Sequence, residues 1–164
     1  MEKRPGIIGL TGAFKEAVAD LPDGSKIVFT GSVAVCTPFA ELLAYAVKDR
    51  SFEIVFLPRA EMGQARHMRW REGLGFCVAD ELADPCAPDA IVILGGLAMP
   101  KFGVPVSQVR DLLTTLARGK RAKVIGVCFM SILQRSGWHK ELPFDAIIDA
   151  TMESTIETGP SLQP

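Results

Sequence analysis

The sequence predicts an α/β domain of the three-layer, Rossmann-like (flavodoxin-like) type, with helices on both faces of a doubly wound, mostly parallel sheet of five or six strands. Two observations predict this class. Short, continuous runs of β-branched and other apolar residues recur along the chain, which is the pattern of strands buried on both faces. Segments with a helical apolar period lie between these runs, and such alternation favours parallel strands joined by right-handed crossovers.

The expected strands are the uninterrupted apolar runs. They lie at residues 26–30, 53–57, 90–94, 123–128 and 146–150, with a weaker candidate at 76–79. The run at 26–30 ends in Gly31 and the run at 90–94 ends in Gly95-Gly96, whereas the run at 123–128 leads into a new helix. A glycine at the end of a strand allows a tight turn there.

The expected helices have apolar residues on one face. They lie at residues 11–21, 37–47, 61–72, 106–116 and 130–136, and the segment 61–72 is polar and rich in arginine. Thr37 is expected to cap the second of these helices, with Pro38 at its first position. Gly119 is expected to end the helix at 106–116.

Length and charge narrow the possible classes of protein. The chain has 164 residues, 18 of them Lys or Arg and 19 Asp or Glu, so its net charge is −1. We expect one α/β domain over residues 1–152 and an extended or flexible tail over 153–164. Near-neutral charge argues against nucleic acid as a partner. No apolar run approaches the ~18 residues of a membrane helix, so no membrane contact is expected.

The N-terminal residues indicate a cytoplasmic protein, and this location decides how the cysteines are interpreted. The first five residues, Met-Glu-Lys-Arg-Pro, have no apolar signal core behind them. The four cysteines are therefore expected to be thiols, and their spacing fits no zinc or iron–sulfur signature. We predict no metal site, and the sequence names no cofactor.

Three loops rich in small residues are expected to meet beyond the carboxyl ends of the strands. They are the segments 30–37, 95–100 and 128–131. In open α/β sheets, ligands bind at this edge, where the strand order reverses. The first loop lacks the further glycines of a dinucleotide fingerprint and the Gly-Lys-Ser/Thr of a phosphate loop. The candidate ligand-binding residues are Gly31, Ser32, Cys36, Thr37, Gly95, Gly96, Phe129 and Met130.

Cys128 is the candidate catalytic residue. It stands where a strand turns into a helix, which is the position of a nucleophile elbow, and a helix N-terminus can lower the pKa of a thiol. Glu41 or one of the two histidines is the candidate assistant. The alternative is that Cys128 is a packed core residue, as cysteines often are. Met130 also stands where such elbows carry a small residue.

Two further groups are candidate contact surfaces. Five basic residues cluster around the expected helix at 61–72 and, with Trp70, could bind an anion or flank a subunit interface: Arg59, Arg66, His67, Arg69 and Arg71. Trp138-His139 is expected to form an exposed lip after a helix stop. A homodimer is the expected assembly, because two-fold dimers are the commonest oligomers.

Three sequence runs resemble an uncharacterised protein family of methanogenic archaea. They are Cys-Thr-Pro-Phe-Ala-Glu-Leu-Leu-Ala-Tyr at 36–45, Leu-Gly-Gly-Leu-Ala-Met-Pro-Lys at 94–101 and Ile-Gly-Val-Cys-Phe-Met at 125–130. The resemblance covers most of the chain. It implies a cytosolic archaeal protein and supplies no activity.

A more distant resemblance covers residues 89–128. A strand that ends in Gly-Gly, then a helix, then a strand carrying cysteine is similar to the layout of the class I glutamine amidotransferase and PfpI-like superfamily. The resemblance implies a nucleophilic Cys128, supported in the protease-like branch by a glutamate that Glu41 could match. Phe129 departs from the histidine that follows the cysteine in that branch, and the downstream His-x-Glu pair of the amidotransferases is absent.

Three functional hypotheses remain open at this point. The first is a domain that binds a small anionic or cofactor-like ligand at the carboxyl edge of the sheet. The second is a cysteine-nucleophile enzyme that uses Cys128. The third is a non-catalytic assembly subunit.

Overall fold

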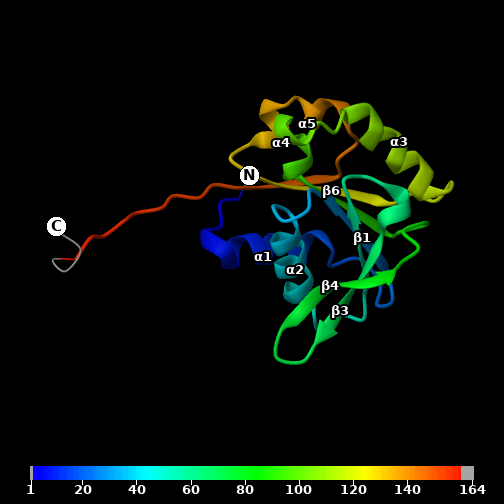
Figure 1. Cartoon of the computed structure of the whole chain (residues 1–164), viewed down its shortest axis with the longest axis horizontal. Helices are drawn as coiled ribbons and strands as arrows, with labels where there is room; N and C mark the ends of the chain where they lie inside the picture. The colour runs from blue at the N-terminus through cyan, green and yellow to red at the C-terminus, as the bar shows by residue number, and fades with distance from the viewer. Residues whose placement is uncertain (1, 160–164) are drawn as a thin grey trace.

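The fold is built on one seven-stranded sheet with helices on both faces. We describe residues 2–159 of a computed structural model (Figure 1). The strands are β1 (Lys26–Gly31), β2 (Glu53–Pro58), β3 (Arg66–Arg71), β4 (Gly75–Leu82), β5 (Ala90–Leu94), β6 (Lys123–Phe129) and β7 (Ala146–Ala150). Their order across the sheet is β4-β3-β2-β1-β5-β6-β7. The α/β class predicted from the sequence is therefore confirmed, with more strands than expected.

Two helical layers enclose the sheet. The α-helices are α1 (Gly6–Ala17), α2 (Thr37–Ala46), α3 (Val106–Ala117), α4 (Ile132–Arg135) and α5 (Trp138–Glu141). The 3₁₀ turns are η1 (Met62–Gln64), η2 (Gly95–Ala98) and η3 (Pro100–Phe102). Helices α1 and α2 pack on one face of the sheet and α3, α4 and α5 on the other, so the central strands are buried on both faces.

Parallel pairing holds only in part of the sheet. Strand β1 pairs in parallel with β2 and β5, and β5-β6-β7 continue in parallel. Strands β3 and β4 form an antiparallel hairpin at the other edge. Strand β1 is the point where the strand order reverses, because β2 lies on one side of it and β5 on the other.

The expected helix at 61–72 is wrong. Only Met62–Gln64 is helical, and Arg66–Arg71 is strand β3. Gly73 and Gly75 adopt positive φ, which permits the tight turn into β4. Trp70 then lies across from Phe76, with ring centroids 5.6 Å apart. Cross-strand aromatic pairing of this kind outweighs the helix propensity of arginine and glutamate.

The other helix boundaries also differ from expectation. Helix α1 spans residues 6–17 rather than 11–21. Cys36, not Thr37, is the N-cap of α2, and no side chain caps that helix. Helix α4 begins at Ile132 because Met130 and Ser131 both have positive φ, which no α-helix accommodates.

Trp138 is buried in α5, 6% exposed, so the expected exposed lip is wrong. The indole packs in the apolar cluster between α3, α4 and the sheet, because the turn at Gly137 directs the chain back over that face.

The chain after β7 leaves the domain. Residues 151–159 form no helix or strand, and Figure 1 shows them extending away from the sheet. The division into a domain over 1–152 and a tail over 153–164 stays a prediction, and residues 160–164 lie outside the described part of the chain. No described helix is long and apolar enough to cross a membrane.

Aspartate side chains stabilise the amino edge of the sheet by accepting hydrogen bonds. Asp89 accepts a hydrogen bond from the backbone N–H of Lys26 at 2.8 Å and one from Lys120 Nζ at 2.6 Å. The bond from Lys120 is the main cause of the lowered pKa of Asp89, and the Lys26 amide adds to it. A lowered folded-state pKa means that the charged form stabilises the native state.

Replacing Asp89 by alanine is expected to lower the free energy of unfolding by about 1–3 kcal/mol at pH 7, because the Lys26 amide loses a charged acceptor. The contribution is present above the unfolded-state pKa of about 3.9 and is lost as the pH falls through the lower folded-state pKa. The difference from wild type should therefore shrink below about pH 4. Urea unfolding at several pH values measures it, and the exposed Asp49→Ala is the control. A pH-independent difference would contradict this role.

Candidate functional site

The carboxyl edge of the sheet brings the three small-residue loops together. A Cβ atom placed on Gly96, in η2, would overlap Cys36 Sγ and lie 2.7 Å from Ser32 Oγ. A Cβ on Gly95 would lie 2.6 Å from the Cβ of Cys128. The loops after β1, β5 and β6 therefore touch, as the sequence predicted, and glycine is required at positions 95 and 96 by close approach.

Packed side chains fill the centre of this junction. Ser32 Oγ and Cys36 Sγ lie 3.2 Å apart, and the residues are 1% and 3% exposed. Gly31 is tight against the Cys36 side chain as well. These residues are packed at the carboxyl edge of the sheet. The polar atoms of Ser32 and Cys36 contact each other and do not face solvent.

Cys128 is enclosed in the same way. It has no exposed surface, and its thiol faces Asp149 Oδ1 at 3.5 Å and Gln134 Oε1 at 3.8 Å. Burial, with the Asp149 carboxylate as a further cause, raises the pKa of Cys128 to about 11. A thiol in these surroundings stays protonated near neutral pH and is a poor nucleophile.

Native Cys128 is expected to resist alkylation. With a pKa of about 11, against about 8.5 for a free thiol, its thiolate fraction near neutral pH is lowered by roughly a hundredfold or more, and burial hinders the reagent further. Mass spectrometry after iodoacetamide treatment at pH 8 should show labelling at the half-buried Cys77 and none at Cys128. Unfolding in urea should make both react. Native labelling of Cys128 at the rate of Cys77 would contradict this enclosure.

Glu41 lies away from Cys128. Its Oε1 accepts a 3.3 Å hydrogen bond from the backbone N–H of Val78, because α2 packs against β4. Strand β4 and the Cys128 strand, β6, are separated by four other strands. Glu41 therefore binds the β3–β4 hairpin and does not contact the Cys128 thiol.

The loop between β1 and α2 contains several backbone amides that lack an acceptor among the described residues. Within the described residues, the N–H groups of Val33, Ala34, Val35 and Thr37 have no hydrogen-bond acceptor, whereas the N–H of Cys36 donates to the carbonyl of Ser32 at 2.9 Å. Ala34 has a φ of 67°, and the side chains of Val33 and Val35 are exposed. Successive amides around a left-handed residue, at the start of a helix, form a concavity suited to an anion.

Two cations lie at the same edge of the sheet, one directly after β2 and one in η3. The N–H of Arg59, directly after β2, donates to the carbonyl of Gly31 at 2.9 Å. The Arg59 guanidinium reaches the carbonyl of Phe102 at 3.1 Å, and Lys101 Nζ lies 5.0 Å from the centroid of the Phe102 ring. Glu61 is the acid near Arg59, at 3.7 Å. Arg59 and Lys101 thus flank the carboxyl edge on the side of β1 and β5.

Phe129 and Met130 lie at the end of β6, beside the place where the loops meet. Phe129 packs on Phe39 of α2, with ring centroids 4.4 Å apart, and Met130 is half exposed. Asp149 of β7 accepts bonds from Ser131 N–H at 2.9 Å and Ser131 Oγ at 2.6 Å, which holds the left-handed turn. The sequence reasoning did not single out Asp149; the signal was one aspartate in an otherwise apolar strand, Ala-Ile-Ile-Asp-Ala.

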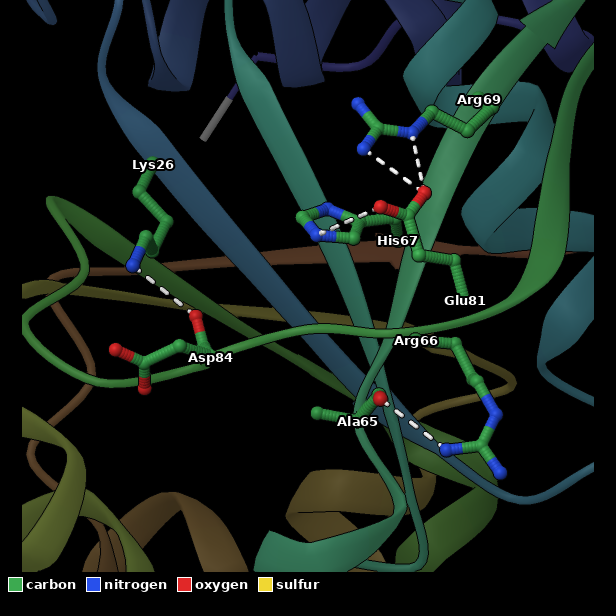
Figure 2. Close-up of polar contacts among 7 residues, drawn as sticks. All are labelled: Lys26, Ala65, Arg66, His67, Arg69, Glu81 and Asp84. Atoms are coloured by element: carbon green, nitrogen blue, oxygen red, sulfur yellow. Dashed lines mark hydrogen bonds and ion pairs between the residues drawn. The ribbon is translucent and has the colours of Figure 1, made fainter.

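The basic cluster is divided between two places. Arg59 lies at the carboxyl edge, whereas the other four basic residues lie on β3. Figure 2 shows His67 and Arg69 both directed toward Glu81 on β4, at 4.0 Å and 3.0 Å. Arg66 donates to the carbonyl of Ala65 at 3.3 Å (Figure 2). Most of the expected anion-binding patch thus lies on β3, the inner strand of the edge hairpin, with charges partly paired within that hairpin.

The amino edge carries a shallow hollow of about 300 Å³, lined by Asp20, Leu21, Asp89, Arg121, Lys123 and Asp145. Each of its acidic side chains has a basic partner: Lys123 on Asp20, Lys120 on Asp89 and Arg121 on Asp145. These ion pairs stabilise the amino ends of the strands. Among the residues that the structure describes, no group of three potential ligands is placed to hold a metal ion.

The chain is similar over nearly its whole length to proteins of methanogenic archaea. An uncharacterised protein of Methanocaldococcus jannaschii, MJ1183, is 38% identical over 95% of this chain and 92% of its own length. An uncharacterised protein of Methanothermobacter thermautotrophicus is 35% identical over 94% of this chain and 95% of its own. A crystal structure of a protein of unknown function from that organism superposes with a TM-score of 0.85 at 32% identity, covering 97% of both chains.

A family model confirms the archaeal resemblance. It is described as "Uncharacterized protein conserved in archaea (DUF2124)" and matches residues 5–153, which is nearly all of the folded domain. The chain belongs to this family of uncharacterised archaeal proteins, which has relatives in methanogens.

Proposed function

We propose that this protein is a binding domain for a small anionic ligand, held at the carboxyl edge of the sheet by the amides of the loop between β1 and α2. The observation that carries the proposal is the set of backbone N–H groups at Val33, Ala34, Val35 and Thr37 without acceptors among the described residues. Amides in this arrangement suit a phosphate or a carboxylate.

The position of the loop supports the proposal. The five parallel strands follow the order β2-β1-β5-β6-β7, and the loop follows β1, where that order reverses. Ligands of open α/β sheets bind at this place. Glycine at positions 95 and 96 lets the loop after β5 approach Ser32, Cys36 and Cys128 closely, which supports the loop after β1 from below.

Charge and surface chemistry also favour an anionic ligand with an apolar part. Arg59, whose N–H bonds to the carbonyl of Gly31, and Lys101 supply positive charge at this edge of the sheet. Val33 and Val35 are 59% and 39% exposed and would contact the apolar part. The four cysteines are free thiols, which is in keeping with a protein of the cytosol.

Catalysis by Cys128 gains no comparable support. The thiol is enclosed and its pKa is raised, and Glu41 serves another strand. The Asp149 carboxylate lies 3.5 Å from this thiol, but full burial and the raised pKa keep the sulfur protonated and out of reach of a substrate. The ligand is therefore held at the carboxyl edge of the sheet by non-covalent contacts alone.

Thermal unfolding with a panel of phosphate compounds tests the proposal. The panel is inorganic phosphate, pyrophosphate, AMP and FMN, each at 1 mM. A compound bound with a dissociation constant of about 10 μM adds about 2.7 kcal/mol of stability, or a rise in melting temperature of roughly 5–10 °C.

The variant Arg59→Gln should reduce this rise, and Arg71→Gln on β3 is the matched control that should leave it unchanged. No shift with any compound, or equal loss in both variants, would overturn the proposal.

A further inference from the structure

The chain beyond β7 has the pattern of a strand without a partner strand. Even-numbered positions from Ala146 through Ile148, Ala150, Met152 and Ile156 are apolar, apart from Ser154, whereas the odd-numbered positions after 147 are Asp, Thr, Glu, Thr and Glu. This alternation continues the period of β7 through residue 157. Yet residues 151–157 are unpaired, with Met152 55% and Ile156 90% exposed (Figure 1).

Strand β7 is itself open along one side. It ends the sheet order and, among the residues that the structure describes, pairs only with β6. The carbonyl of Ala150 accepts a bond from the N–H of Met130, so the even-numbered residues direct their backbone groups to β6 and the odd-numbered ones direct theirs outward. Such an edge is a template for another strand.

The tail cannot cover this edge within its own chain. Folding back onto β7 requires a tight turn, and the segment Thr-Met-Glu-Ser-Thr-Ile-Glu-Thr at 151–158 contains no glycine, asparagine, aspartate or proline to form one. The tail and the open edge therefore complement each other only between two chains. A two-fold axis satisfies both at once, since each copy gives a tail and receives one.

We propose that β7 and residues 151–158 pair antiparallel with the same residues of a second copy of this chain, across a two-fold axis at Met152. Residues 154–158 of each copy then lie along β7 of the other, and the two sheets become continuous. The pairing runs from Ala146 opposite Thr158 to Met152 opposite itself.

Side-chain matching is compatible with this register and rejects an axis at the neighbouring odd-numbered residues. Ile156 lies opposite Ile148, Ser154 opposite Ala150, and Asp149 opposite Thr155, so no two acids face each other. An axis at Glu153 would set that glutamate against its own copy, and an axis at Thr155 would set Glu153 against Glu157. The register also keeps even-numbered residues opposite even-numbered ones, as the outward backbone groups of β7 require.

The apolar face of the joined strands has a surface to cover it. Ile148 and Ala150 pack against the core cluster under α1 and α2, so Ile156 of the second copy is added on that face. Helix α1 packs beside β7, and its first turn exposes Ile7 and Ile8. Two strands alone are marginal, whereas strands added to a covered sheet are stable.

Sedimentation equilibrium of the full chain is the first test. The wild type should be a dimer. Ile156→Asp should raise the dissociation constant at least about tenfold, because an apolar contact repeated twice by symmetry is lost. Leu74→Asp, which changes another exposed apolar residue (73% against 90%) in the turn between β3 and β4, should leave the dimer intact. A monomeric wild type, or an unchanged Ile156→Asp dimer, would overturn the proposal.

Disulfide trapping tests the axis. At a non-hydrogen-bonded antiparallel pair the Cα atoms lie about 4.5 Å apart, within disulfide reach. Met152→Cys should therefore link two chains under mild oxidation, and Ser154→Cys, displaced by two residues in each copy, should not. Linkage at Ser154→Cys instead of Met152→Cys, or linkage of neither variant in a dimer, would overturn the register. A partner other than a second copy would show as a monomer with no linkage.

Discussion

Replacing Phe29 by alanine is expected to lower the free energy of unfolding by about 3–5 kcal/mol, the largest effect of any substitution considered for this protein. Phe29 lies in β1, the strand at the centre of the sheet, and its side chain has no exposed surface. Its ring packs on Phe14 of α1, with centroids 5.7 Å apart. Truncation leaves a cavity between the sheet and α1 that the stiff central strand cannot close.

Urea unfolding followed by circular dichroism measures this loss. Leu74→Ala is the control, because that side chain is 73% exposed and its removal should change stability by less than about 0.5 kcal/mol. A loss below about 1 kcal/mol at Phe29 would contradict the packing of α1 on β1.

Replacing Gly96 by alanine is expected to cost about 1–3 kcal/mol, because the added methyl group overlaps the Cys36 sulfur and lies 2.7 Å from Ser32 Oγ. The neighbouring atoms are themselves buried and cannot move aside freely. This substitution tests whether the loops after β1 and β5 are in contact at the carboxyl edge.

A double-mutant cycle with Cys36→Ala identifies the cause. Removing the sulfur should recover part of the cost of Gly96→Ala, so the double variant should be more stable than the sum of the single effects predicts by about 0.5 kcal/mol or more. The free energy of unfolding of all four proteins measures the coupling. Strict additivity would mean that the two residues do not meet, contrary to the geometry of the edge.

The sheet core was predictable from the sequence because its signal is local. The runs at 26–30, 90–94 and 123–128 are apolar without alternation, and each is a central parallel strand. The same local reasoning failed at 61–72. There, the deciding interactions are between strands, such as Trp70 on Phe76, and helix propensity does not encode them.

The edge at which the loops meet was predictable, but the state of its side chains was not. Gly95-Gly96 indicated a close approach, and the glycines do lie against Cys128 and Cys36. Whether a cysteine at a strand end is open or enclosed depends on what packs over it, here Ile132, Leu133 and Asp149. Trp138 shows the same dependence, because only the path of the chain after Gly137 buries it.

The free amides of the loop at 33–37 escape sequence reasoning for a different reason. Hydrogen-bonding capacity of the backbone is the same for nearly every residue type, so its use depends on conformation alone. The positive φ of Ala34 has no sequence signal, since alanine rarely adopts it.

Amide chemical shifts of ¹⁵N-labelled protein during titration with pyrophosphate offer the sharpest test of anion binding by this loop. We expect saturable shifts confined to Val33, Ala34, Val35 and Thr37 and to their neighbours at Arg59 and Gly96, weaker in Arg59→Gln than in Arg71→Gln. Shifts confined to the basic strand β3, or none at this loop with pyrophosphate in excess, would contradict the proposed site.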